Sequence, residues 1–132
     1  MNIINDQYKY SELTSKIIGC AFTVHQTLKS GFQEVIYQRA LAIEFDLAGI
    51  SFHQEFEMQI YYKDIHIGTR RVDFLVEDAI SLEIKATTKL DDIHLAQAIN
   101  YLEIYNLEVG LLINFGESSL KFKRLINRKF KQ

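Results

Sequence analysis

The residues best suited to chemistry are an aspartate, a glutamate and a lysine in the segment RRVDFLVEDAISLEIKA, residues 70–86. Asp73, Glu83 and Lys85 each stand between apolar neighbours. Because successive side chains of a strand point to opposite faces, the apolar set fills one face and the three polar side chains share the other. A three-residue turn centred on Asp78 then places Asp73 opposite Glu83, and Lys85 opposite Arg71, across a β-hairpin.

Two carboxylates that meet across a hairpin repel each other unless a cation lies between them. Mg²⁺, with Mn²⁺ as a substitute, is the usual ion where carboxylates and a substrate phosphate share a site. A lysine one step along the strand then positions the attacking water or balances charge on the phosphate. The pattern therefore indicates a metal-dependent phosphodiesterase. It also fits an ordinary solvated hairpin face, whose ion pairs contribute little to stability.

The composition predicts one globular domain spanning residues 1–132, with 48% apolar and 24% charged residues. There is no apolar run of membrane-spanning length and no leader pattern, so we expect neither a membrane span nor a secretory signal. Cys20 is the single cysteine, which excludes an internal disulfide and fits a reducing cytoplasm. Its apolar neighbours predict a buried, unreactive thiol.

Basic residues are concentrated at the end of the chain, although the formal net charge is −2. The last twelve residues, KFKRLINRKFKQ, hold six of the fifteen lysines and arginines and none of the seventeen acids. Lys121, Lys123 and Arg124, interleaved with Phe122 and later Phe130, suit contact with a phosphate backbone. The alternative is a solubilising C-terminal strand and tail.

The hydrophobic pattern predicts the order ααβββαββ, an α/β sandwich whose mixed central sheet is flanked by helices. Ser30 and Gln33 read as a capping box that begins the second helix, and Gly49 ends it. Strands 79–86 and 109–115, joined by a helix, are expected to be parallel neighbours in a right-handed crossover. The expected helices cover about 8–28, 30–48 and 91–106, and the strands about 52–62, 65–76, 79–86, 109–115 and 120–125.

Four further side chains could join the site. Gln97 and Tyr101 share one face of the third helix, where they could contact a phosphate or orient the lysine, or be a surface amide and a core aromatic. Glu34 begins the second helix, where the helix dipole favours any acid, and where a third metal-binding carboxylate could also stand. His25 could contact phosphate or be a satisfied, partly buried histidine.

Several segments together resemble a known family. GFQEVIY, from Gly31 to Tyr37, resembles the G-x-x-E-x-x-Y signature of the small bacterial GxxExxY proteins, which are assigned to the PD-(D/E)XK nuclease superfamily. The similarity covers nearly the whole chain, through VHQTL, IYYKDIHIGTRRVDFLV, LEIKA, AQAINYL, VGLLINFG and LKFKR. It implies a restriction-endonuclease-like fold and Mg²⁺-dependent cutting of phosphodiesters. Two positions depart from the expected pattern: Val72 stands in place of proline, and Lys29-Ser30-Gly31 in place of Gly-Pro-Gly.

The resemblance also implies roles for individual residues. Asp73 matches the metal-binding aspartate, and Glu83 and Lys85 match the (D/E)-x-K pair, with the backbone carbonyl of Ile84 as an added metal ligand. Glu34 matches the helical carboxylate that completes the metal shell in many members. Gln97 and Tyr101 match the Q-x-x-x-Y element of the RecB-like branch.

The sequence thus predicts a nuclease acting on nucleic acid, with DNA the favoured substrate. Either it cuts nonspecifically or by structure, or a protein partner or a second copy in a homodimer directs it. Two other hypotheses stay open. One is a catalytically silent nucleic-acid- or protein-binding module on the same fold, and the other is a structural dimer subunit without nucleic-acid affinity. The complete Asp–Glu–Lys set favours the nuclease, because a silent relative is expected to lose at least one of the three.

Overall fold

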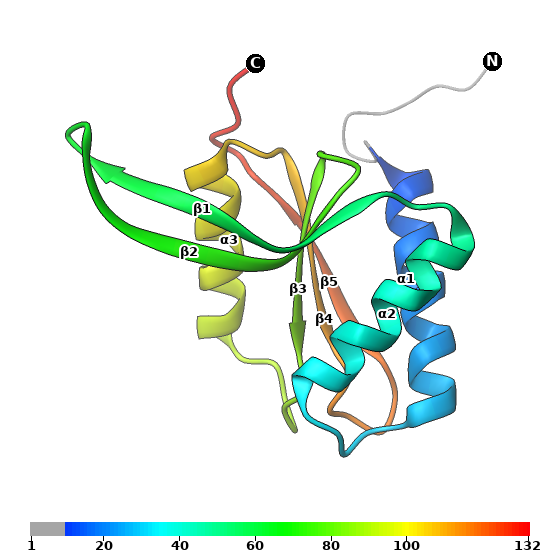
Figure 1. Ribbon diagram of the computed structural model, residues 1–132. Helices are drawn as coiled ribbons and strands as arrows, with labels where there is room; N and C mark the ends of the chain where they lie inside the picture. Colours follow the sequence, from blue (N-terminus) through cyan, green and yellow to red (C-terminus); the bar gives the residue numbers. More distant parts are fainter. Residues whose placement is uncertain (1–9) are drawn as a thin grey trace.

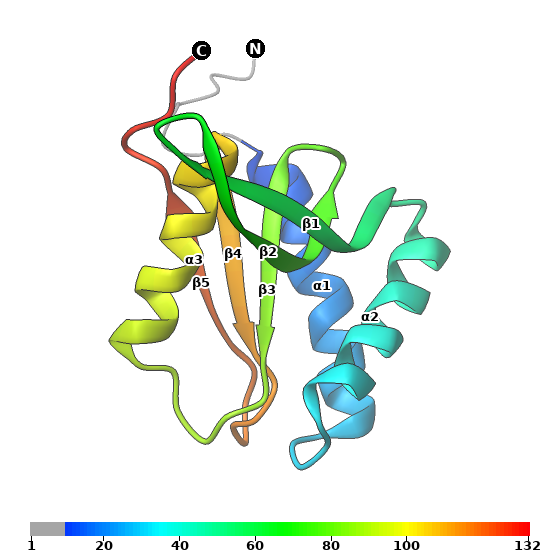
Figure 2. The ribbon, with the colours of Figure 1, turned by 60° about the vertical axis from the view of Figure 1, so that its left-hand side comes forward.

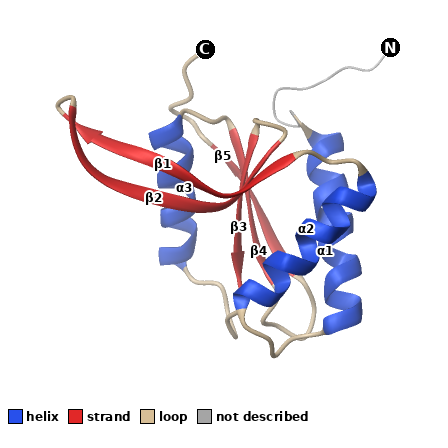
Figure 3. Cartoon of the chain, viewed as in Figure 1, coloured by secondary structure: helices blue, strands red, loops and turns tan. Residues whose placement is uncertain are grey.

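The computed structural model describes residues 10–132, and within them the chain forms three helices and five strands in the order ααβββαββ (Figure 1, Figure 3). This order confirms the predicted fold class. The expected start of the first helix near Tyr8 lies outside the described residues. The helices are α1 (Ser11–Leu28), α2 (Glu34–Ala48) and α3 (Asp92–Tyr105), and the strands are β1 (Phe52–Tyr62), β2 (Ile65–Val76), β3 (Ile80–Lys85), β4 (Val109–Asn114) and β5 (Lys121–Ile126).

The five strands form one mixed sheet in the order β1-β2-β3-β4-β5. Strands β3 and β4 are parallel neighbours, as predicted, and every other adjacent pair is antiparallel. Helices α1 and α2 cover one face and α3 covers the other (Figure 2). The larger core lies under α1 and α2, and a smaller one, with Leu102 and Leu112 at its centre, lies under α3. Because both faces are covered, β4 is buried along its whole length.

The helix ends follow the local sequence in two of three cases. Gly49 ends α2 in the left-handed conformation, with φ of 72°. Asp91 begins α3 by accepting a hydrogen bond from the His94 backbone N–H, and the His94 side chain returns to the Asp91 N–H. The Ser30–Gln33 capping box is wrong, since Gln33 itself is the N-cap residue of α2 and makes no side-chain cap bond.

A tyrosine holds the start of α2 instead. The Tyr37 hydroxyl donates to the Lys29 carbonyl at 2.5 Å and accepts from the Phe32 N–H at 3.2 Å. Gly31, between them, has φ of 116°, which favours glycine. A side chain one turn into the helix therefore fixes the loop before it, and this positions the first helical residue, Glu34.

Strands β1 and β2 form an arm that projects beyond the sheet (Figure 1). Their ladder runs from Phe52–Val76 to Tyr62–Ile65 but omits Glu55, which has φ of 53°. The ladder between β2 and β3 covers only residues 74–76 and 80–82. Asp73, which stands opposite the irregular Glu55, therefore lies at a break in the pairing on both sides of β2. Within residues 10–132, no helix combines the length and apolarity needed to cross a bilayer.

Candidate active site between the hairpin, α2 and α3

The hairpin turn that carries the predicted acidic pair forms as expected. Val76 pairs with Ile80, and the Ala79 N–H donates to the Val76 carbonyl at 2.9 Å, which closes the three-residue loop. Beyond Phe74 the two strands separate. The Asp73 carboxylate fills the gap, since its Oδ2 accepts from the Ile84 backbone N–H at 2.7 Å. A side chain thus takes the place of a ladder hydrogen bond and holds Asp73 in a fixed position.

The carboxyl groups of Asp73 and Glu83 meet across this gap and hydrogen bond to each other. The expected juxtaposition is present. The predicted pairing of Lys85 with Arg71 is wrong, because the ladder has already ended. Arg71 pairs with Glu57 on β1, and its Nη2 lies 3.0 Å from the Glu57 Oε1 on an exposed surface.

Glu83 is buried, with 7% of its surface exposed. Burial, and then the charge of Asp73, raise the pKa of Glu83 to about 9. Burial also raises the pKa of Asp73, against the effect of the Ile84 N–H and the charge of Lys85. The direction for both groups is the same, so the pair retains a proton near neutral pH, with Glu83 as its donor and Asp73 as its acceptor. A carboxylate on a solvated hairpin face would be exposed and would not have its pKa raised by burial. The interpretation as an ordinary surface ion pair therefore does not describe Glu83.

The Oε1 atom of Glu83 indicates that the acidic pair is suited to bind a cation. This oxygen is fully buried and has no hydrogen-bond partner among the described residues. An unpaired buried carboxyl oxygen is costly, and a bound cation is one of the few things that explain one. Two close carboxylates with a free oxygen fit Mg²⁺, which is commonly held by one or two carboxylates together with substrate phosphate.

The third predicted carboxylate stands further out. Burial raises the pKa of Glu34, and the charges of Lys85 and Asp73 both act on it, so it faces the pair from the first turn of α2. Nevertheless, no three His, Cys, Asp or Glu side chains in residues 10–132 form a group arranged to hold a metal. The structure brings together Asp73, Glu83 and Lys85, with Glu34 at the periphery.

One residue at the site was missed by the sequence analysis. Gln38, buried on α2, has its Nε2 3.4 Å from the Asp73 Oδ1. It follows Glu34 by four residues, so the two share one face of the helix. That spacing was the available signal.

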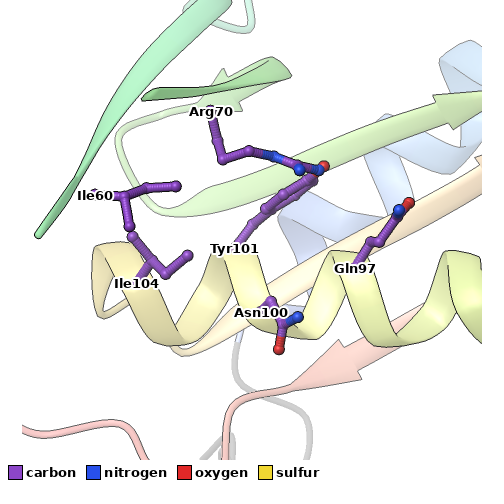
Figure 4. Close-up of a pocket in the computed structure, with 6 residues that line it drawn as sticks. All are labelled: Ile60, Arg70, Gln97, Asn100, Tyr101 and Ile104. Carbon is purple, nitrogen blue, oxygen red and sulfur yellow. The ribbon is translucent and has the colours of Figure 1, made fainter. Parts of the chain in front are cut away.

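Gln97 and Tyr101 lie together on α3, as their spacing predicts, and line a small surface pocket with Ile60, Arg70, Asn100 and Ile104 (Figure 4). Tyr101 is 8% exposed and packs against Met58 and Val72, so it is a core aromatic along much of its ring. Arg70, which lines the pocket, is three residues before Asp73 on β2, and its charge opposes the raised pKa of Glu83.

The predicted nucleic-acid contacts are divided by the sheet. Lys121 pairs with Asn114 and Lys123 with Leu112, so both lysines project from the α3 face, the same face as Glu83. Arg124 alternates to the opposite face.

His25 is a core residue. It is 6% exposed, and its Nε2 lies 3.0 Å from the Glu117 carbonyl oxygen. This contact supports the interpretation of a satisfied, buried histidine, and no phosphate contact is proposed for it.

A buried asparagine fixes the end of β3. Asn114 is fully buried and pairs in register with Lys85. Its Oδ1 accepts from the N–H groups of Thr87 and Gly116 at 3.0 Å each, and its Nδ2 donates to the Thr87 carbonyl at 3.0 Å. Together with the bond from the Phe115 N–H to the Lys85 carbonyl, at 2.8 Å, these contacts hold the backbone of the lysine.

The fold and the buried acidic pair are typical of metal-dependent nucleases, and the comparisons with known proteins agree with this class. The model of the PD-(D/E)XK nuclease superfamily matches residues 11–127, so the chain belongs to that superfamily. The chain is also similar to the crystal structure of SSO0001, with a TM-score of 0.57 and 17% identity over 92% of this chain. This likeness shows the fold alone, and the chain spans 61% of the length of that structure. None of the curated proteins matches the chain.

Proposed function

We propose that this protein is a Mg²⁺-dependent nuclease that hydrolyses phosphodiester bonds of DNA, and that it belongs to the GxxExxY group within the RecB-like branch of its superfamily. The observation that carries the proposal is the buried Asp73–Glu83 pair, with its unpartnered oxygen, beside Lys85. A structural pair in a core would have its oxygens satisfied.

The residues have separate roles in this proposal. Asp73 and Glu83 would hold the ion, with the Ile84 carbonyl as a further ligand, and Glu34 would support the ion or a bound water from the first turn of α2. When bound, Mg²⁺ polarises the phosphoryl oxygen and lowers the pKa of a bound water.

The chain's own side chains do the rest. Lys85 would position the attacking water and compensate the charge that develops on the phosphate. Gln97 and Tyr101, on α3, would flank the DNA strand that is cut. Asp73 is kept in place by Gln38 and by the Ile84 N–H, so the acidic pair is preorganised before the substrate arrives.

The test is an incubation of the purified protein with linear, supercoiled and single-stranded DNA, in the presence of Mg²⁺, Mn²⁺ or EDTA. We expect cleavage that EDTA abolishes and that Lys85→Ala removes. Lys89→Ala, a lysine in the loop after β3, is the matched control and should cut as the wild type does. Binding of DNA without cleavage by the wild type, under any of these conditions, would favour the silent binding module instead.

A further inference from the structure

The pocket on α3 contains more free polar groups than a contact with one phosphate requires. It is small, about 110 Å³, and is lined by residues from three elements: Ile60 on β1, Arg70 on β2, and the α3 face that carries Tyr101 (Figure 4). Its walls are of two kinds. Ile60, Ile104 and the Tyr101 ring are apolar, whereas Arg70 and the two amides are polar.

The polar groups have few partners within the protein. Arg70 stacks on Tyr101, with its guanidinium carbon 4.6 Å from the ring centroid, and makes no ion pair with a described carboxylate. Gln97 and Asn100 make no side-chain hydrogen bond to any residue in the range 10–132. Each amide therefore has a free donor and a free acceptor. Gln97 lies on the same side of α3 as Tyr101 and Arg70, whereas the Asn100 amide points away from them (Figure 4).

The chemistry that matches these groups is a flat ring with a hydrogen-bonding edge. A phosphate would use Arg70 but not the isoleucines or the ring face, and it offers amides only acceptors. A nucleobase uses both kinds of wall, because it packs against the isoleucines and stacks on the guanidinium plane of Arg70 while its edge pairs with the Gln97 amide. Only an unpaired base exposes that edge, and a pocket of this size admits one ring.

The position of the pocket links it to the acidic pair. Arg70 is three residues before Asp73 on β2, a separation of about 10 Å along an extended strand. A DNA strand whose phosphate is bound at Asp73 and Glu83 would thus place a neighbouring nucleotide at Arg70. We propose that this pocket binds one unpaired nucleobase next to the phosphate being cut, which makes single-stranded or locally opened DNA the substrate. This inference rests on the proposed function, since that function identifies the bound ligand as DNA.

The test compares a short single-stranded oligonucleotide with the same sugar–phosphate strand lacking bases. Every protein in it carries Lys85→Ala, so that the strands stay intact with Mg²⁺ present. Affinities are measured by fluorescence anisotropy. One stacked base contributes about 1–3 kcal/mol, so the parent should prefer the base-bearing strand by about 5- to 150-fold.

Arg70→Ala should remove this preference, and Arg71→Ala is its matched control. The two arginines are adjacent and the two substitutions remove the same charge, but Arg71 lies on the exposed side with Glu57. Arg71→Ala should therefore keep the preference. Gln97→Ala, which removes the amide on the same side of α3 as Tyr101, should reduce it in part (Figure 4).

Each outcome has a separate meaning. Equal binding of both strands by the parent, or equal effects of Arg70→Ala and Arg71→Ala, overturns the base pocket. So does a weakening in Arg70→Ala that is the same for both strands, which would show a phosphate contact. Cleavage of the same strand by the protein with Lys85 intact is measured in parallel. Cleavage without base preference rejects only the pocket, base preference without cleavage rejects only the hydrolase, and the absence of both rejects both.

Discussion

Replacing Glu83 by glutamine should stabilise the metal-free protein, because it removes a carboxyl group that folding forces to keep its proton. The pKa of Glu83 is raised from 4.5 to about 9 by burial and by the charge of Asp73. Between these two values the folded state binds more protons than the unfolded state, so stability falls as pH rises. The glutamine amide keeps a donor for Asp73 without an ionisable proton.

The magnitude follows from the two pKa values. Each pH unit between them costs about 1.4 kcal/mol, so at pH 7 the wild type has lost about 3 kcal/mol of the free energy of unfolding that Glu83→Gln retains. The loss is absent below pH 4.5 and grows until pH reaches about 9.

The assay is urea denaturation in EDTA at a series of pH values from acid to alkaline. The difference between Glu83→Gln and the wild type should widen steadily as pH rises. Glu12→Gln, which changes an exposed carboxyl on α1, is the control and should follow the wild type. A wild-type stability that is flat across this range, or a Glu83→Gln protein no more stable than the wild type at pH 8, would refute the proton shared by the pair.

Three further predictions concern the metal, the nucleic acid and the support of the site. Mg²⁺ or Mn²⁺ should raise the melting temperature of the wild type but not of Asp73→Asn, because an ion that binds only the folded state stabilises it; an equal shift in both would place the ion elsewhere. Replacing Lys121 and Lys123 together by alanine should flatten the salt dependence of DNA binding, by about 0.9 in the log–log slope for each phosphate that the protein no longer neutralises on duplex DNA, whereas Arg124→Ala, on the opposite face, should leave the slope unchanged. Gly116→Ala should lower the melting temperature, since its Cβ would overlap the backbone of Thr87 in the loop after β3; Gly19→Ala, which meets nothing within 4 Å, is the control.

The sequence predicted the elements well because their signals are local. Alternation placed β2 and β3, the spacing around Asp78 gave the correct hairpin register, and the helix expected at about 91–106 matches α3. The second helix was the exception. Ser30 and Gln33 have the spacing of a capping box, but a tyrosine hydroxyl and a glycine with positive φ determine that helix end.

The site was predicted in part, since its acidic pair depends on register alone. What could not be predicted depends on contacts between distant elements. The burial of Glu83 results from tertiary packing over a face that alternation alone describes as polar and exposed. Alternation places the adjacent Arg70 and Arg71 on opposite faces of β2. Only the positions of α3 and β1 show that Arg70 stacks on Tyr101 and that Arg71 lies beside Glu57.

The break in the strand pairing at Asp73 divides the molecule into two parts that can open separately. Beyond it, β1 and β2 pair only with each other and rest on α3, whereas β3 and β4 are buried at the centre of the sheet. Hydrogen exchange should therefore be faster for amides in the arm, residues 56–72, than for those in β4, through openings that leave the core folded. Arg70 lies on one side of this boundary and Glu83 on the other. Substitutions that loosen the arm should thus change the affinity for the DNA strand while leaving metal affinity unaltered. DNA binding and cleavage can therefore be altered independently.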